Sequence, residues 1–178
     1  KTSMITSQLG LWSRYLDPLR CRGSEPSIRI LWGQYDQPHR WPRGEEEDEN
    51  NHSVAVRIAF GESSFLVVGD MEEISQEAMV ARYQRNIGVL NTDVYVAGHH
   101  GSGNGTSEAL VRAMKPELAV ISAGDPSDRE SGRFNAYKFG HPNEKAIRLI
   151  SDPTYGVTMT RPSTCVGVGI KGENPFTR

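Results

Sequence analysis

Hydrophobic and polar residues alternate with a period of two in several short segments, which is the pattern of half-buried β-strands. Two further segments are almost continuously apolar, which favours strands buried on both faces. Between two of these runs, Gly61, Glu62 and Ser63 predict the turn of a β-hairpin. We therefore expect strands at residues 27–32, 53–60, 64–68, 92–97 and 118–122, and a terminal hairpin at 157–159 and 166–170.

Apolar residues recur at helical spacing in the segments between these strands. They predict helices at residues 4–17, where Pro18 ends the first, and at 72–86, 106–114 and 142–150. Thr106 or Ser107 is expected to cap the third of these helices, and Pro116 to stop it. Pro142 suits the first helical position of the fourth, which would put His141 near its N-cap. Strands that alternate with helices indicate an α/β fold.

Two polar stretches interrupt this pattern. Residues 34–51 carry two prolines and an acidic run at 45–49, and residues 124–138 are rich in Asp, Ser, Arg and Gly. We expect both to be loops on the surface. The chain divides most simply into an N-terminal helix with its connector, residues 1–27, and one larger unit, residues 28–178.

Composition supports one globular domain with a real core. The chain has 178 residues, 37% of them hydrophobic, and a mean hydropathy of −0.52. A net charge of −2 provides no global basic field for nucleic acid, although metal ions could supply positive charge at a phosphate. The two cysteines, Cys21 and Cys165, match no metal-binding spacing.

The first residues of the chain and the length of its apolar runs predict the cellular location of the protein. No run is long enough to cross a membrane, and the first residues lack the apolar core of a signal peptide, so we expect a cytoplasmic location. Because the chain begins with Lys1, we expect a processed or truncated product, such as a proteolytic fragment.

The candidate chemistry lies where apolar runs end. His99 and His100, flanked by Gly98 and Gly101, follow the expected strand at 92–97. Two adjacent imidazoles are hard to explain by core packing, because burying both would leave several ring nitrogens to satisfy. Taken alone, Asp70 after Gly69 is better explained as ordinary turn chemistry. Together with His141 these side chains are suitable ligands for a divalent metal.

The order of these motifs resembles the metallo-β-lactamase superfamily, in particular the hydrolase domain of the ComEC competence proteins used in DNA uptake. The matching features are an Asn-x-x-Ser at residues 50–53, Gly-Asp at 69–70, His-His-Gly-Ser at 99–102, Ser-Ala-Gly at 122–124 and His-Pro at 141–142. The resemblance implies an αββα sandwich of two similar halves. It covers roughly residues 28–150 and corresponds to the C-terminal half.

The resemblance also implies roles for residues. Asp70, His99 and His141 would be metal ligands, with two Zn or Mn ions as cofactors. His99 would be either a ligand or the proton donor to the leaving group, and His100 would support the same catalytic site. Gly101 and Ser102 would hold a phosphate oxygen of the substrate. The ions would polarise the phosphoryl group and activate a water molecule.

One signature of the superfamily is absent. No His-x-His-x-Asp-His loop occurs in the chain. We therefore expect an N-terminal half, from the same precursor or from a separate chain, to complete a metal-dependent phosphodiesterase or nuclease. Two alternatives remain open, namely a non-catalytic docking or regulatory subunit of the same fold and a hydrolase of lactones or thioesters. His52 is a minor candidate ligand, for which an exposed loop histidine is the simpler interpretation.

Overall fold

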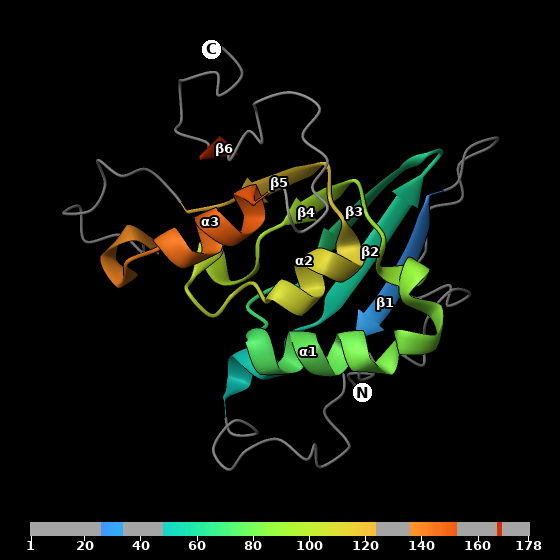
Figure 1. Ribbon diagram of the computed structural model, residues 1–178, viewed down its shortest axis with the longest axis horizontal. Coiled ribbons are helices and arrows are strands. Elements are labelled where there is room, and N and C mark those ends of the chain that lie inside the picture. The colour runs from blue at the N-terminus through green and yellow to red at the C-terminus, as the bar shows by residue number, and fades with distance from the viewer. Residues whose placement is uncertain (1–25, 34–47, 124–135, 153–166, 169–178) are drawn as a thin grey trace, which may run out of the picture.

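In the part of the chain that the structure describes, six strands form one mixed sheet and follow one another across it in chain order. β1 to β3 are antiparallel neighbours, whereas β3 to β6 run parallel to one another (Figure 1). Their bounds are β1 Ser27–Trp32, β2 Ala55–Phe60, β3 Ser63–Val67, β4 Val94–Val96, β5 Leu118–Ile121 and β6 Gly167–Val168. The α/β class expected from the sequence is confirmed.

The computed structural model describes residues 26–33, 48–123, 136–152 and 167–168. The expected helix at 4–17, both cysteines, most of the polar stretches at 34–51 and 124–138, and the first arm of the terminal hairpin lie outside these ranges. Within them, no helix combines the length and the apolar character that crossing a membrane requires.

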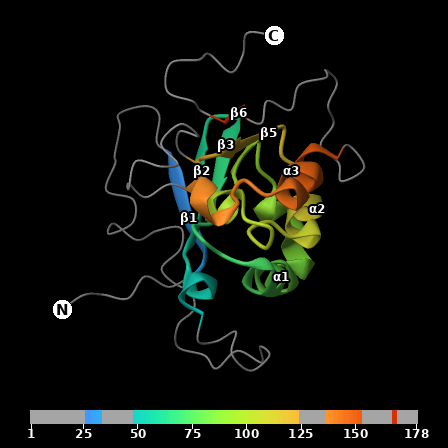
Figure 2. The same ribbon diagram turned by 90° about the vertical axis from the view of Figure 1, so that its left-hand side faces the viewer.

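Three α-helices lie on one face of the sheet, as Figure 2 shows in side view. They are α1 Glu73–Arg82, α2 Glu108–Met114 and α3 Glu144–Ser151. Leu66, Tyr95 and Ala119 occupy one row across β3, β4 and β5, and each is at most 1% exposed. Met79 of α1 and Leu110 of α2 are fully buried in the same core cluster. The core therefore lies between the sheet and the helices.

The alternate positions of the strands form a second apolar surface. Side chains of successive strand residues point to opposite faces, so this surface lies on the side of the sheet away from the core row. Two rows in register make it, namely Ile28, Ile58, Phe65, Val94 and Leu118, and Ile30, Val56, Val67, Val96 and Val120. Phe65 is 43% exposed, and no described α-helix lies on this side (Figure 2).

The strands predicted at 27–32, 53–60, 64–68, 92–97 and 118–122 agree with the structure to within two residues at each end, but two helix predictions need correction. The segment 72–86 is helical only to Arg82, and a 3₁₀ segment, η3 Gln84–Leu90, follows and is kinked at Asn86. Pro142 does not occupy the first helical position of α3. Asn143 is the N-cap of that helix, since its Oδ1 accepts a hydrogen bond from Lys145 N at 2.9 Å. The first helical residue is therefore Glu144, and Pro142 lies before the cap.

One smaller detail also differs from the sequence expectation. Residues Glu49–His52, expected as part of a loop, form the 3₁₀ turn η2, with Asp48 as its cap. β6 pairs in parallel with β5, and its expected hairpin partner at 157–159 lies outside the described residues. For α2 the expectation holds, since Ser107 is the cap and its Oγ accepts from Leu110 N at 3.2 Å.

Candidate functional site

The predicted residues gather where parallel strands end. β3, β4 and β5 run in the same direction, so the loops that follow them share one edge of the sheet. His99 N donates to Gly69 O at 3.0 Å, which joins the loop after β4 to the loop after β3. His100 Nδ1 lies 2.7 Å from Ser122 O, which joins it to the end of β5.

His141 reaches this edge from the segment before α3. Its ring lies edge to face with that of His99, and the two centroids are 5.4 Å apart. The backbone holds the two segments together, because Asn143 N donates to Gly101 O at 2.8 Å. Phe139 also stacks with His141, with its ring centroid 6.5 Å from that of the imidazole. Two histidines that are distant in sequence are thus direct neighbours.

Both rings carry a ring nitrogen that lacks a hydrogen bond. Nδ1 of His99 and Nδ1 of His141 are buried, and neither has a hydrogen-bond partner among the described residues. Glu72 Oε1 lies 3.6 Å from His99 Nδ1, which is close enough for charge attraction but too far for a hydrogen bond. Buried polar atoms are nearly always satisfied, so two orphaned imidazole nitrogens side by side indicate a site for an external ligand.

Electrostatics keep one of these rings neutral. Partial burial lowers the pKa of His141, and the nearby His99 and His100 lower it further, whereas Asp70 raises it. The net effect is a pKa below the usual range for histidine. A neutral imidazole retains the lone pair that a metal ligand or a proton acceptor requires.

The two adjacent histidines have a strained backbone. His99 has φ 49° and His100 has φ 54°, both in the left-handed region that non-glycine residues rarely adopt. Each such residue costs about 1–3 kcal/mol, and such strain clusters at functional sites. The flanking Gly101, at φ 76°, adopts its conformation without this cost.

Buried side chains hold the strained loop in place. Tyr95 is fully buried and its hydroxyl accepts from Gly98 N at 3.1 Å. Gln76 of α1 donates to Gly105 O at 2.8 Å and accepts from Ser107 N at 2.7 Å. A Cβ atom on Gly98 would lie 2.5 Å from Gly105 O, so only glycine fits where the two segments of the loop cross.

Asp70 is positioned by the Asn-x-x-Ser segment. Ser53 Oγ accepts from Asp70 N at 3.1 Å. Gly69 precedes it at φ 59°, and a Cβ atom there would press on Ser53 at 3.2 Å. This contact gives the motif a physical role, since it links the start of β2 to the turn that carries the carboxylate.

Gly101 and Ser102, the predicted substrate-binding pair, form hydrogen bonds to other residues of the protein. Ser102 is 2% exposed, and its Oγ donates to Asn104 Oδ1 at 2.6 Å. Its backbone N–H donates to His99 O at 2.9 Å, and Gly101 O is used by Asn143. Contact of Gly101 and Ser102 with substrate therefore stays a prediction.

The structure brings the predicted residues together only in part. His99 and His141 are in contact, and His100 and Asp70 lie close enough to affect the pKa of His141. Within the described ranges, however, no three His, Cys, Asp or Glu side chains form a group that could hold a metal ion by themselves. His52 ends η2 and is only partly buried.

Sequence reasoning missed Glu72 and Ser53 as supporting residues. Glu72 lies two residues after Asp70, on the turn into α1, and its side chain approaches His99. Its position two residues after Asp70 is the sequence feature that could have identified Glu72 as a supporting residue. Ser53 was visible as part of a motif, but its bond to the Asp70 backbone could come only from the fold.

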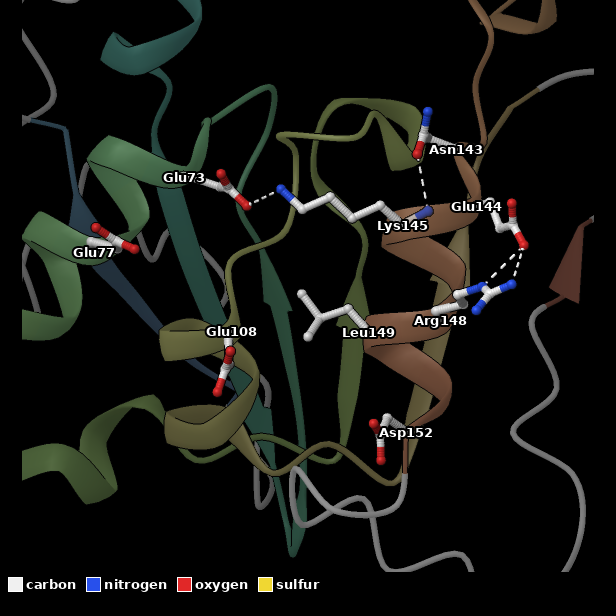
Figure 3. A pocket seen from close by; sticks show the side chains of 9 residues that line it. All are labelled: Glu73, Glu77, Glu108, Asn143, Glu144, Lys145, Arg148, Leu149 and Asp152. Atoms are coloured by element: carbon white, nitrogen blue, oxygen red, sulfur yellow. Dashed lines mark hydrogen bonds and ion pairs between the residues drawn. The ribbon is translucent and has the colours of Figure 1, made fainter.

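A larger groove lies elsewhere and carries different chemistry. It measures about 830 Å³ and lies between α1, α2 and α3 (Figure 3). Two ion pairs stand in it, Lys145 with Glu73 at 2.6 Å and Arg148 with Glu144 at 2.6 Å, but five acidic side chains against two basic ones leave the lining acidic. None of the described residues that line it is a histidine, so we place the candidate site at the strand ends rather than in this groove.

Comparison with known proteins identifies relatives, two of which are named for competence and for recombination. No protein-family model matches the chain. It is 38% identical over 114 residues to competence protein ComA of Neisseria gonorrhoeae, which covers 64% of this chain and 14% of that protein. It is 36% identical over 93 residues to recombination protein 2 of Haemophilus influenzae, covering 52% of this chain and 10% of that protein.

A third relative is the uncharacterized protein YcaI of Escherichia coli, 29% identical over 132 residues, covering 72% of this chain and 16% of that protein. The chain thus spans between 10% and 16% of the length of these relatives. Two of the names fit the resemblance to competence proteins that the motifs indicate.

Proposed function

We propose that the chain is the C-terminal half of a metallo-β-lactamase-type αββα domain that hydrolyses phosphodiester bonds in nucleic acid. The observation that carries this proposal is the contact of His99 with His141, in which the buried Nδ1 atoms of both rings lack a hydrogen-bond partner among the described residues. Such paired imidazoles at the ends of parallel strands suit metal-assisted hydrolysis better than structural support.

The second apolar face of the sheet supports the idea of a missing half. Two rows of apolar side chains form this face on the side away from α1, α2 and α3. Apolar sheet faces are stable when they pack on another layer, most simply a second sheet. Because the matched region is at most 16% of the length of each relative, the rest of the polypeptide could supply that layer.

The donor atoms present suit a divalent metal but form only part of a site. Asp70, His99 and His141 would hold it, since an orphaned imidazole nitrogen and a carboxylate suit Zn and Mn alike. A pair of such ions, when bound, polarises a phosphoryl group and lowers the pKa of water. The remaining ligands would come from the N-terminal half of the domain.

The chain's own residues would prepare the site for this chemistry. The lowered pKa of His141 keeps its lone pair available at neutral pH. Glu72 would orient the His99 ring through its negative charge, and the bond from Ser53 would hold the Asp70 turn. His100, anchored on Ser122 O, would keep the strained loop in register with β5.

Nucleic acid is the substrate that we favour. The relatives are named for competence and for recombination, and both names point to the handling of DNA. Phosphodiester hydrolysis agrees with a loop that supplies imidazole and carboxylate groups at one edge of the sheet.

The test compares site variants in the polypeptide that carries this chain. We expect His141→Gln and Asp70→Asn to reduce hydrolysis of a labelled oligonucleotide and of bis(p-nitrophenyl) phosphate by at least about 100-fold with Zn²⁺ or Mn²⁺ present. The matched control is Glu117→Gln, at an exposed position before β5, which should retain activity. Circular dichroism of each variant verifies the fold.

Three outcomes would reject the proposal. Full activity in both His141→Gln and Asp70→Asn would remove these residues from the site. Wild-type protein that cleaves lactones or thioesters but no phosphodiester would point to a small-molecule hydrolase. Protein with no activity and no bound metal would indicate a docking subunit.

A further inference from the structure

A second groove lies near the opposite end of the sheet. It measures about 350 Å³ and is formed by β1, β2 and η3. In the strand register, Ser27 pairs with Ala59 and Ala59 with Ser64, so the groove lies near the amino end of β3. The candidate histidines follow the carboxyl ends of the parallel strands. The groove is therefore separate from the site described above.

Two arginines face each other in this groove. Arg29 of β1 is the direct cross-strand partner of Arg57 of β2, and both line the cavity. Like charges directly opposite each other on a sheet are destabilising. A pair of this kind therefore weakens the sheet locally, and a bound anion would remove the repulsion.

The described structure does not neutralise these charges. Neither arginine forms an ion pair among the described residues, and none of those that line the groove is acidic. Asp93 is the carboxylate whose charge acts on Arg57, but it accepts hydrogen bonds from Ser64 N at 2.5 Å and from Ser64 Oγ at 2.8 Å. Asp93 therefore offsets part of the charge of Arg57, and the two arginines together keep a net positive charge in the groove.

The guanidinium of Arg57 is already oriented. Its Nε donates to Asn91 O at 2.8 Å, which leaves the two terminal nitrogens to donate elsewhere. Partial burial lowers the pKa of Arg57 first, and the charge of Arg29 lowers it further. The charge of Asp93 acts in the opposite direction and raises this pKa, and an anion bound beside Arg57 would act in the same direction as Asp93.

The chemistry of the lining selects the kind of anion. Arginine forks bind phosphate oxygens bidentately, and Asn86 and Ser27 add neutral donors at the rim. A volume of about 350 Å³ falls within the range of sites for small organic molecules, so a phosphate fits together with the group that it esterifies.

We propose that the groove between Arg29 and Arg57 binds a phosphate group of a nucleic-acid strand. The contact would be sequence-independent, because guanidinium groups that grip a phosphate read no base. The choice of nucleic acid as the source of this phosphate rests on the proposed function, whereas binding in the groove does not require hydrolysis. Binding in the groove can be measured with cleavage suppressed.

The experiment uses the polypeptide that carries this chain, with EDTA present to prevent cleavage. Fluorescence anisotropy of a labelled single-stranded oligonucleotide gives the Kd over a range of salt concentrations. For the double variant R29Q/R57Q we expect about tenfold weaker binding. The slope of log K against log salt should become shallower by about 0.7 for each phosphate that the variant no longer neutralises.

Two further variants separate binding from folding and from net charge. R148Q removes an equally positive but exposed residue of α3 and should leave the Kd almost unchanged. R29Q alone preserves the bond of Arg57 to Asn91, so it carries little risk to the fold and should still weaken binding. Unchanged hydrolysis of bis(p-nitrophenyl) phosphate in these variants would confirm that the histidine site is intact.

A parallel calorimetric titration with inorganic phosphate identifies the source of the phosphate. Loss of oligonucleotide binding in R29Q and R29Q/R57Q, but not in R148Q, supports the proposal. Loss of inorganic phosphate binding alone would show that the groove takes free phosphate and would overturn the nucleic-acid assignment. Equal binding by R29Q/R57Q and R148Q in both measurements would overturn the proposal entirely.

Discussion

The rings of His99 and His141 lie edge to face with centroids 5.4 Å apart, although one follows β4 and the other precedes α3. The hydrogen bond from Asn143 N to Gly101 O ties their two segments together. This relationship gives the chain its candidate chemistry, because each ring has a buried Nδ1 atom with no hydrogen-bond partner in the described structure.

Glu72 provides the first prediction. Because its carboxylate lies 3.6 Å from His99 Nδ1, Glu72→Gln should remove the charge that orients the ring. Losing such a supporting carboxylate typically costs about 10–100-fold in activity or metal affinity. We expect kcat/KM for a phosphodiester to fall by that amount. The neighbouring variant Glu73→Gln, which breaks only an exposed pair with Lys145, is the control and should stay near wild type.

Ser53 provides the second prediction. Ser53→Ala deletes the acceptor of the Asp70 N–H bond, so the turn that carries the carboxylate should loosen. The fold should persist, but kcat should fall more than KM rises, since Asp70 would be misplaced rather than removed. Steady-state kinetics would check this. Ser63→Ala, at an exposed position of the hairpin, should be silent, and identical kinetics in the two variants would contradict the positioning role.

Gly98 allows a test of the loop crossing. In Gly98→Ala the new methyl group would lie 2.5 Å from Gly105 O, so the loop must shift or the protein must lose stability. Overpacking of this kind costs about 1–3 kcal/mol. The free energy of unfolding in urea would measure it. Gly88→Ala, where a methyl group meets no atom within 4 Å, should be neutral, and equal stability of the two variants would refute the account.

The buried hydroxyl of Tyr95 leads us to expect that the protein loses stability at alkaline pH. Burial raises the pKa of its hydroxyl, against the hydrogen bonds with Thr106 and Gly98 that lower it. A folded-state pKa above the usual value near 10 means that its contribution is complete below that pH and is lost as pH rises toward the folded value.

Tyr95→Phe should remove this alkaline sensitivity but leave Gly98 N–H without its acceptor at 3.1 Å. An unsatisfied buried N–H costs about 1–3 kcal/mol, so the variant should be less stable at pH 7. Urea unfolding between about pH 7 and pH 11, a range that spans the ordinary tyrosine pKa, measures both effects. A variant with the same stability and the same pH profile as the wild type would show that this bond is unimportant.

Much of the fold follows from local patterns. The alternation in 27–32 predicts β1 with its bounds, and the hydroxyl of Ser107 before an amphipathic run predicts the start of α2. Such features depend on neighbouring residues in the chain, through backbone hydrogen bonding and the period of side-chain direction. The break after Arg82 was missed because a helical spacing of apolar residues also permits a turn of 3₁₀ helix.

The sequence by itself therefore determined the α/β class, most strand bounds and the identity of the chemical groups at Asp70, His99, His100 and His141. Only the tertiary structure decided that His99 touches His141, that Glu72 approaches His99, and that Arg29 faces Arg57. The reason is physical. Secondary structure follows from local propensity and periodicity, whereas contacts between distant residues depend on strand order, register and packing, which no local pattern encodes.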